Sequence, residues 1–231
     1  MVRPKRNQQH PNLPGAIKDV ARKQISEHGT ASLSLRAVAR ELGITAPAIY
    51  NYFPRRDDLV TALIVDAYHS LAKSLTETQH NLKGDHAWRI KASARAYRNW
   101  ALAHAAEYSL IFGTPIPGYH ASMAVTGPAA AESMLALIQV LDAAYQDGVL
   151  SVGELSPALI AMLQSWVEQM DYSGPPAVIH LALAFWAQLH GLVSLELFGH
   201  LGADTECDED NDASALFEAE IQYMTARMGL N

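Results

Sequence analysis

Apolar residues recur every three or four positions along most of the chain, which is the pattern of helices that bury one face. Stripes of this kind cover residues 17–25 and 35–42, and Gly29 and Gly43 follow them at positions where helices commonly stop. The same periodicity predicts further helices over 57–78, 87–106, 128–146, 157–171, 177–199 and 213–228. We find no strand-like alternation and therefore expect an all-α fold.

Two segments are too rich in glycine and proline to be helical. Residues 113–118 read Gly-Thr-Pro-Ile-Pro-Gly, and residues 174–176 read Gly-Pro-Pro. The helix between them at 157–171 is capped by Ser156. We expect five of its side chains to face inward: Leu159, Met162, Leu163, Trp166 and Met170.

The most apolar helix, over 177–199, is long enough to cross a bilayer. It nevertheless contains His180, His190 and Glu196, and no lysine or arginine flanks it to set an orientation. A helix that is apolar all round is otherwise buried on all sides. We therefore expect one face on the chain's own core and another against a second subunit, with no membrane contact. The predicted interface residues are Trp186, His190, Val193 and Leu197.

Two polar residues of this helix leave alternatives open. His190 is a ligand anchor, a dimer contact or, as is more common for such a histidine, a satisfied core residue. Glu196 is expected to have a hydrogen-bond partner, for which a histidine is one candidate.

Charge divides the chain into a basic head and an acidic body. Residues 1–60 carry ten Lys and Arg against five Asp and Glu, whereas residues 61–231 carry seven against nineteen, which gives the net charge of −7. No lysine or arginine occurs between Arg98 and Arg227, where average composition would place about 15. Only the head is therefore suited to a polyanion such as nucleic acid.

Metal, cofactor and catalytic signals are weak. The single Cys207 excludes an intramolecular disulfide and a multi-cysteine metal site. Asp208, Asp210 and Asp212 lack the glycine and glutamate of a calcium loop, and Ser70-x-x-Lys73 lacks the companion motifs of a serine enzyme. We expect no metal, no cofactor and no enzymatic activity. The polar, proline-rich start has no apolar run of signal-peptide length, which favours the cytoplasm.

The pattern of residues 34–53 predicts a helix-turn-helix. Ser34 caps the first short helix, Gly43 provides the turn, and Thr45 and Pro47 begin the second. Apolar side chains pack the pair together: Leu35, Val38, Leu42, Ile44, Ile49 and Phe53. The side chains left for solvent or a partner are Arg36, Arg40, Thr45, Ala46, Ala48, Tyr50, Asn51 and Tyr52.

These exposed residues suit double-stranded DNA. Small side chains at the start of the second helix permit a close approach to base edges, and Thr45 with the first amides of that helix suits phosphates. Arg36 has the geometry for a bidentate contact to guanine, and Tyr50 can donate to a phosphate.

The string Ser34-Leu-Arg-Ala-Val-Ala, Leu42-Gly-Ile-Thr, Ile49-Tyr-Asn-Tyr-Phe and Arg56-Asp-Asp-Leu, with the helices around it, resembles the DNA-binding domain of the tetracycline-repressor (TetR) family. The resemblance implies an all-helical homodimer, usually a repressor that a small ligand releases from its operator. Carried over by position, the family's DNA contacts fall on Arg36, Thr45, Ala46, Pro47, Ala48, Tyr50, Asn51, Tyr52 and Arg56.

Three positions depart from the family pattern. Tyr52 stands where histidine is frequent, and Arg55 replaces the Ser or Asn that would cap the following helix, at a cost of about 1 kcal/mol. Ala46 and Ala48 offer only methyl groups, so base reading is expected to depend on thymine methyls and Arg36.

The resemblance suggests a division of the chain. We expect a flexible basic arm over 1–15, a three-helix DNA-binding domain over 16–56, a linker helix over 57–78 and a ligand-binding and dimerisation domain over 87–231. Whether the arm reaches a minor groove or is simply solvated stays open. Within the last domain, the run from Trp186 to Leu197 looks like a Trp/His/Gly signature of one TetR regulatory-domain group.

The effector is expected to be a small neutral or cationic lipophile, because the body has few cations with which to bind an anion. Candidate pocket residues are Trp100, His104, Tyr108, Phe112, Trp166 and Phe185, for each of which ordinary core packing is the more common role. Two alternatives to a ligand-responsive regulator stay open: a helical protein-interaction adaptor, and a ligand-sequestering protein with a vestigial head.

Overall fold

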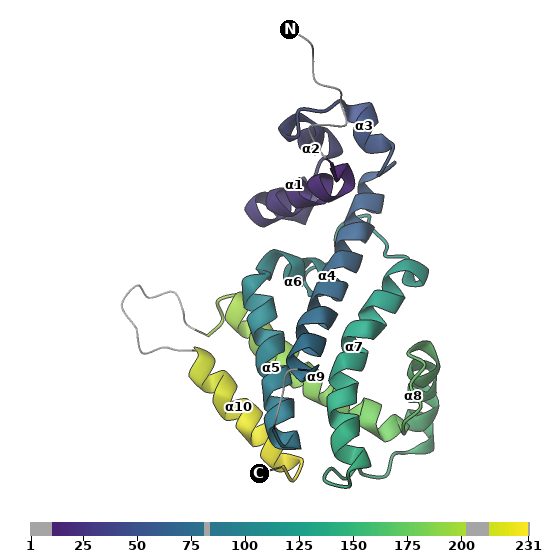
Figure 1. Ribbon diagram of the computed structural model, residues 1–231, viewed down its shortest axis with the longest axis vertical. Coiled ribbons are helices and arrows are strands. Elements are labelled where there is room, and N and C mark those ends of the chain that lie inside the picture. Colours follow the sequence, from purple (N-terminus) through teal and green to yellow (C-terminus); the bar gives the residue numbers. More distant parts are fainter. Residues whose placement is uncertain (1–10, 81–83, 202–212, 231) are drawn as a thin grey trace. The chain divides into compact units, whose positions relative to one another are not determined.

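The computed structural model describes residues 11–80, 84–201 and 213–230, and every regular element in these ranges is helical (Figure 1). The elements are α1 (Leu13–His28), η2 (Thr30–Ser32), α2 (Leu35–Glu41), α3 (Ala46–Tyr50), α4 (Arg56–His80), α5 (His86–Ala103), α6 (Ala105–Phe112), α7 (Met123–Gln146), α8 (Pro157–Gln169), α9 (Pro176–Leu197) and α10 (Ala213–Arg227). The predicted all-α fold is confirmed. Arg3, Lys5, Arg6, Cys207 and the acidic loop 204–212 lie outside the described residues.

The chain forms two compact units. The first comprises the residues up to Ala67 together with His104–Thr126, and the second comprises Tyr68–Ala103 and the chain from Gly127 onward. Helices α4 and α7 therefore contribute residues to both units. The predicted division differs, because it assigned 104–126 to the C-terminal domain.

The first unit is organised around α1. The Asn12 side chain accepts a hydrogen bond from the Gly15 amide at 3.1 Å, so the helix begins at Leu13 and residues 13–15 do not belong to the predicted arm. Its buried face carries Ile17, Ala21 and Ile25, as the periodicity predicts.

An ion-pair network ties α1 to α4 within the first unit. Asp66 of α4 receives Lys18 Nζ at 2.7 Å and Arg22 Nη2 at 2.6 Å, and all three side chains are partly buried. Two basic residues of the head are therefore neutralised by the unit's own carboxylate.

The second unit buries residues of α5, α7, α9 and α10, including Tyr97, Leu137, Phe185 and Phe217. Helix α8 packs on α9. Its Leu163 and Met170 are buried and Leu159 is half-buried, but Met162 is 54% exposed and Trp166 is 38% exposed. The prediction that these two side chains face inward is wrong for the isolated chain, because only the side of α8 toward α9 is covered.

Two helix boundaries depart from the periodicity. The predicted helix over 87–106 is interrupted at His104, whose φ of −129° and ψ of 45° are not helical. The chain leaves the second unit at this residue, and Tyr108 is buried in the first. Helix α7 starts at Met123, ahead of the predicted 128, and contains Pro128. The Ser122 carbonyl accepts the Val125 and Thr126 amides and so starts the helix before the proline.

Helices α7 and α9 are both long and apolar enough to cross a membrane by length and composition alone. The core helices of soluble proteins pass the same test.

Candidate DNA-binding surface

The helix-turn-helix forms as predicted. Ser34 Oγ accepts a hydrogen bond from the Ala37 amide at the start of α2. Gly43 adopts a φ of +64° in the turn, and the Ile44 amide then reaches back to the Ala39 carbonyl at 3.0 Å. Of the six apolar residues expected to join the helices, Leu35, Val38, Ile49 and Phe53 are buried, and Leu42 and Ile44 are half-buried.

Most of the predicted DNA contacts lie at the surface. The exposed ones are Arg36, Thr45, Pro47, Tyr50, Asn51 and Tyr52, and Ala46 and Ala48 are half-buried on the short helix α3. Tyr50 and Tyr52 are unusually exposed for aromatic side chains, at 41% and 49%. An exposed tyrosine pair beside small residues is more easily explained by a partner than by packing.

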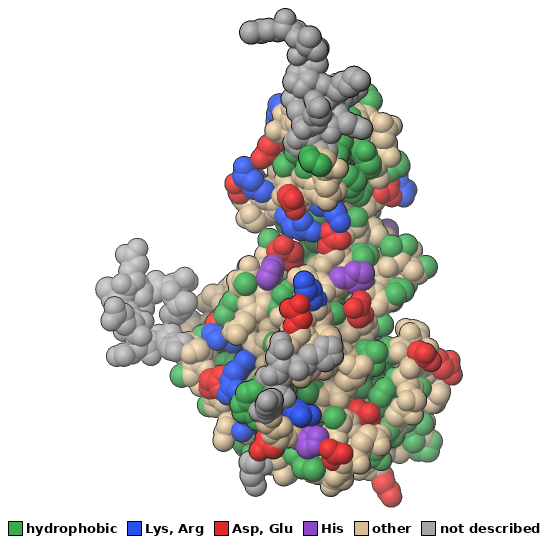
Figure 2. All heavy atoms as spheres, in the orientation of Figure 1, with side chains coloured by type: hydrophobic (Ala, Val, Ile, Leu, Met, Phe, Trp, Pro, Cys, Tyr) green, Lys and Arg blue, Asp and Glu red, His purple; other side chains and the backbone are tan. Residues whose placement is uncertain are grey.

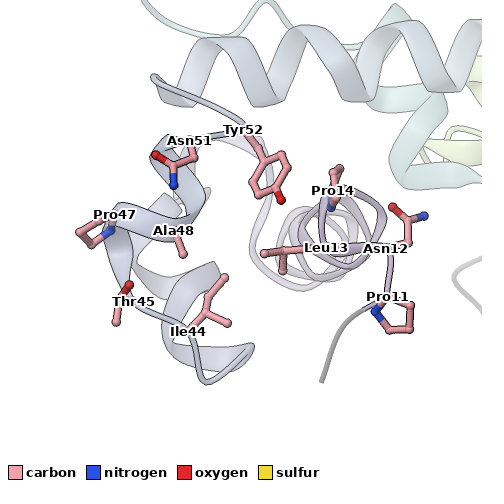
Figure 3. A pocket seen from close by; sticks show the side chains of 10 residues that line it. All are labelled: Pro11, Asn12, Leu13, Pro14, Ile44, Thr45, Pro47, Ala48, Asn51 and Tyr52. Carbon is pink, nitrogen blue, oxygen red and sulfur yellow. The ribbon is translucent and has the colours of Figure 1, made fainter. Parts of the chain in front are cut away.

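A hollow of about 590 Å³ separates the start of α1 from α3 (Figure 3). Its walls are Pro11, Asn12, Leu13, Pro14, Ile44, Thr45, Pro47, Ala48, Asn51 and Tyr52. Figure 3 shows the Tyr52 ring directed toward Leu13 and Pro14 across the hollow. No lining residue is acidic, so an anionic sugar–phosphate backbone would meet no repulsive side chain there. No pattern in the sequence predicts that Pro11–Pro14 lie opposite α3.

Arg56 occupies a different position from the other predicted contacts. Its Nε donates to the Leu33 carbonyl at 3.1 Å and its Nη2 to the Thr30 carbonyl at 2.6 Å. These bonds fix the first turn of α4 against the segment that precedes α2. A phosphate contact by Arg56 stays a prediction, and its visible role is to position the helix-turn-helix.

The expected weak cap of α4 is repaired locally. The carboxylate of Asp58 accepts the Arg55 amide at 2.9 Å and Arg55 Nη2 at 2.8 Å. The hydrogen bond from Arg55 holds the pKa of Asp58 below its ordinary value. Asp58, in the first turn, therefore caps α4 in place of a Ser or Asn before the helix.

Among the residues of the head that the structure describes, two cations close to α3 have no acidic partner, whereas the other cations are paired. Lys23 Nζ donates to Glu41 at 3.0 Å, and this hydrogen bond to the carboxylate raises the pKa of Lys23. Figure 2 shows blue and red side chains interspersed on the face in view. Within the described part of the chain, Arg36 and Arg40 of α2 are exposed and have no such partner. Arg40 was expected to be exposed but was not assigned a DNA contact.

The six predicted pocket residues divide between the two units. His104, Tyr108 and Phe112 belong to the first, where the Tyr108 and Phe112 rings meet edge to face at 5.2 Å. Trp100, Trp166 and Phe185 belong to the second. Tyr108 and Phe185 are at most 1% exposed, so neither borders open space in this structure.

The predicted interface stripe of α9 meets the chain's own α5 at His190. His190 stacks on Trp186 at 5.2 Å, and its Nδ1 lies 3.4 Å from Tyr97 Oη. Burial lowers the pKa of His190. Val193 is fully buried within the single chain, and its place in a dimer interface stays a prediction. Leu197 is half-buried on the same stripe.

Glu196 is paired with an arginine. Arg98 Nε donates to Oε2 at 2.7 Å and Arg98 Nη2 to Oε1 at 2.5 Å, in the bidentate arrangement that favours this pair. The histidine considered as its partner is therefore not the one used. The guanidinium also lies over the Phe217 ring, 5.4 Å from its centroid.

Metal chemistry finds no support in the described ranges. No three His, Cys, Asp or Glu side chains gather there in a way that could hold an ion.

The helix-turn-helix and its exposed, positively charged face define a DNA-binding protein, and comparison with known proteins identifies its class. Residues 17–63 match the family described as "Bacterial regulatory proteins, tetR family", and residues 90–224 match "Tetracyclin repressor-like, C-terminal domain". The HTH-type transcriptional regulators Rv1816 of Mycobacterium tuberculosis and Mb1846 of Mycobacterium bovis are each 32% identical over 226 residues, covering 96% of this chain and 94% of the relative.

Solved structures agree. The regulatory protein SCO4313 is 36% identical with a TM-score of 0.76, covering 96% of this chain and 98% of that one. A protein of unknown function from Rhodococcus sp. RHA1 shares the fold at 21% identity, with a TM-score of 0.74 and 98% and 99% coverage.

The chain belongs to the TetR family of transcriptional regulators. Members of this family are DNA-binding homodimers, and ligand-responsive repression is typical of them. Because the relatives are transcriptional regulators, this membership favours a regulator over the adaptor and sequestering alternatives. The finer Trp/His/Gly grouping stays an expectation.

Proposed function

We propose that this regulator is a cytoplasmic repressor that binds operator DNA through α2 and α3 and leaves it when a small lipophilic effector binds. The observation that carries the proposal is the pair of unpaired cations, Arg36 and Arg40, beside the exposed face of α3. Every other described basic residue named above in the head has an acceptor in its own unit.

The division of labour among the contacts follows from their chemistry. Arg36 is proposed to read a guanine, and Thr45, Asn51, Tyr50 and Tyr52 to hold the backbone. The small side chains at the start of α3 are proposed to let this helix approach the base edges: Ala46, Pro47 and Ala48. Arg56 is proposed to hold the helix-turn-helix in position and to lie near a phosphate.

A gel-shift series on the intergenic DNA beside the protein's own gene tests this proposal. Wild-type binding should weaken steeply with salt. Tyr50→Phe should weaken binding to all sequences, whereas Arg36→Ala should also relax discrimination at one base pair, by about 1–3 kcal/mol. Lys73→Ala is the matched control, because Lys73 is an exposed cation of the second unit. Equal binding by wild type, Tyr50→Phe and Arg36→Ala would refute the assignment.

For the homodimer we propose the face of α9 opposite α5. It carries Ala184, Gln188, Gly191, Leu195 and Phe198 at helical spacing, exposed except for the half-buried Gly191. A Cβ placed on Gly191 would meet nothing within 4 Å, so this surface is open in the isolated chain. The exposed Ile160, Met162 and Trp166 of the neighbouring α8 extend the apolar area.

Leu195→Glu tests this interface, with Leu216→Glu of α10 as its control, because both leucines are 42% exposed. Light scattering should report a monomer for the first variant and a dimer for the second. A dimer in both cases, or loss of the dimer only in the control, would exclude the proposed face.

The effector is proposed to be neutral or cationic, because the body's cations are largely occupied. Lys91 Nζ binds Gln222 at 3.0 Å, Arg95 binds Glu218 and Arg98 binds Glu196. An anionic compound that released the operator by direct binding would contradict this proposal. Trp100, His104, Tyr108, Phe112, Trp166 and Phe185 stay candidates for the pocket.

A further inference from the structure

Helix α5 carries a row of buried polar atoms that lack partners. Among the described residues, the buried side-chain atoms without a hydrogen bond are His86 Nδ1, Arg89 Nε and Ser93 Oγ. The three residues stand at i, i+3 and i+7, so they share one face of the helix. Buried polar atoms are nearly always satisfied by protein groups, water or a ligand, so a row of such exceptions on one face marks a place to look for a bound molecule.

One end of this face of α5 meets α4 within the second unit. Trp100, seven residues beyond Ser93, donates from Nε1 to Ser70 Oγ of α4 at 3.0 Å. At the other end, His86 Nε2 lies 2.9 Å from Asp147 Oδ2, just beyond α7. Helices α4 and α5 run in opposite directions (Figure 1), and we therefore expect residues that follow Ser70 on α4 to lie opposite residues that precede Trp100 on α5.

Small side chains line this boundary. Ser70 and Ser74 stand one turn apart on α4, and Ser93 and Ala96 stand at neighbouring positions on α5. We call this region, made of Ser70, Ser74, His86, Arg89, Ser93 and Ala96, the α4–α5 seam.

The unpartnered atoms determine which chemistry the seam accepts. Arg89 Nε carries a hydrogen and only donates, and the Ser93 hydroxyl donates or accepts. When His86 donates from Nε2 to Asp147, its Nδ1 is an acceptor. Arg89 is only partly buried, so solvent screens its charge and the seam does not require an anion.

We propose that the α4–α5 seam is the polar anchor of the effector site and that it takes a neutral, largely apolar molecule with a carbonyl oxygen. That oxygen accepts hydrogen bonds from the Ser93 hydroxyl and from Arg89 Nε, while the apolar body lies between α4 and α5. The inference rests on the proposed function and deepens it, because it gives a neutral lipophile a specific functional group and a specific pair of partners.

Three probes of similar size separate the possibilities by titration calorimetry on the purified full-length dimer. Acetophenone offers a neutral carbonyl, ethylbenzene has no acceptor, and benzoate is an anion. Acetophenone should bind about tenfold more tightly than ethylbenzene, as two modest hydrogen bonds predict, and more tightly than benzoate. Absence of acetophenone binding, equal binding of ethylbenzene, or a preference for benzoate would each overturn the proposal.

Variants locate the contact. Ser93→Ala should weaken acetophenone binding about fivefold, whereas Ser133→Ala should leave it unchanged. Ser133 is the matched control, because it is a buried serine whose hydroxyl is satisfied by the Ala130 carbonyl at 2.8 Å. Without a probe, Ser93→Ala should be at least as stable as wild type, since it removes an unsatisfied atom. A purely structural hydroxyl would show the reverse: lower stability and unchanged binding.

A crystal structure with acetophenone and a parallel operator gel shift complete the test. The carbonyl oxygen should lie within hydrogen-bond distance of Ser93 Oγ, and a seam that holds only water would overturn the proposal. Specific DNA binding without acetophenone binding would remove the seam alone, whereas loss of specific DNA binding would remove the proposed function.

Discussion

Gly43→Ala isolates the backbone requirement of the turn between α2 and α3. Gly43 has a φ of +64°, and an added Cβ would meet nothing within 4 Å, so the change introduces strain without a clash. A left-handed conformation costs a residue with a Cβ about 1–2 kcal/mol. The less flexible unfolded chain offsets about 0.4–1 kcal/mol of this cost. The net loss in the free energy of unfolding should be about 1 kcal/mol.

Gly153→Ala is its control. Gly153 also has nothing within 4 Å of an added Cβ, but its φ lies outside the left-handed region. Only the unfolded-state effect applies, and the variant should gain about 0.5 kcal/mol. Urea unfolding measures both values, and a gel shift should show unchanged operator affinity for folded Gly43→Ala. Equal stability of the two variants would refute the reasoning from φ.

Three further changes test the electrostatics. Because burial lowers the pKa of His190, the unfolded chain takes up a proton before the folded chain does as the pH falls. The stability contributed by His190 is therefore complete above about pH 6.5 and falls below that value. His190→Gln should flatten this fall in urea-unfolding series at several pH values, and an unchanged slope would contradict the reasoning. Glu218→Gln removes an exposed pair with Arg95 and should cost less than about 1 kcal/mol, a loss that disappears in high salt during thermal unfolding. Asp66→Asn leaves two cations of α1 without their carboxylate and should cost about 1 kcal/mol in urea unfolding, where no change would show that the network is energetically neutral.

The helix-turn-helix was predictable because its signals are local. Ser34, Gly43 and Pro47 specify a cap, a left-handed turn and a first helical turn from within a few residues of where they act. The buried and exposed faces of such short helices follow directly from the apolar spacing. The sequence therefore predicted both the motif and the exposure of Tyr50 and Tyr52.

The parts of the site that could not be predicted depend on contacts between distant segments. Arg56 binds the carbonyls of Thr30 and Leu33, and backbone carbonyls look the same in every sequence. The hollow beside α3 arises from the approach of Pro11–Pro14, which no spacing rule encodes. The identity of a residue indicates what it can bind, but only the fold decides which partner reaches it.

Helix α9 shows how the orientation of a helix can be recovered when its periodicity fails. A helix that is apolar all round has no hydrophobic face to identify, so the stripe through His190 was assigned to a partner subunit. Its polar residues carry the missing information. His190 and Glu196 meet Tyr97 and Arg98, and both of these partners belong to α5. A buried polar group needs its partner before any dimer forms, so polar residues on such a helix indicate the side that faces its own chain. By the same reasoning, the surface through Ala184, Gly191 and Leu195, which has no charged residue, is the side left for a second subunit.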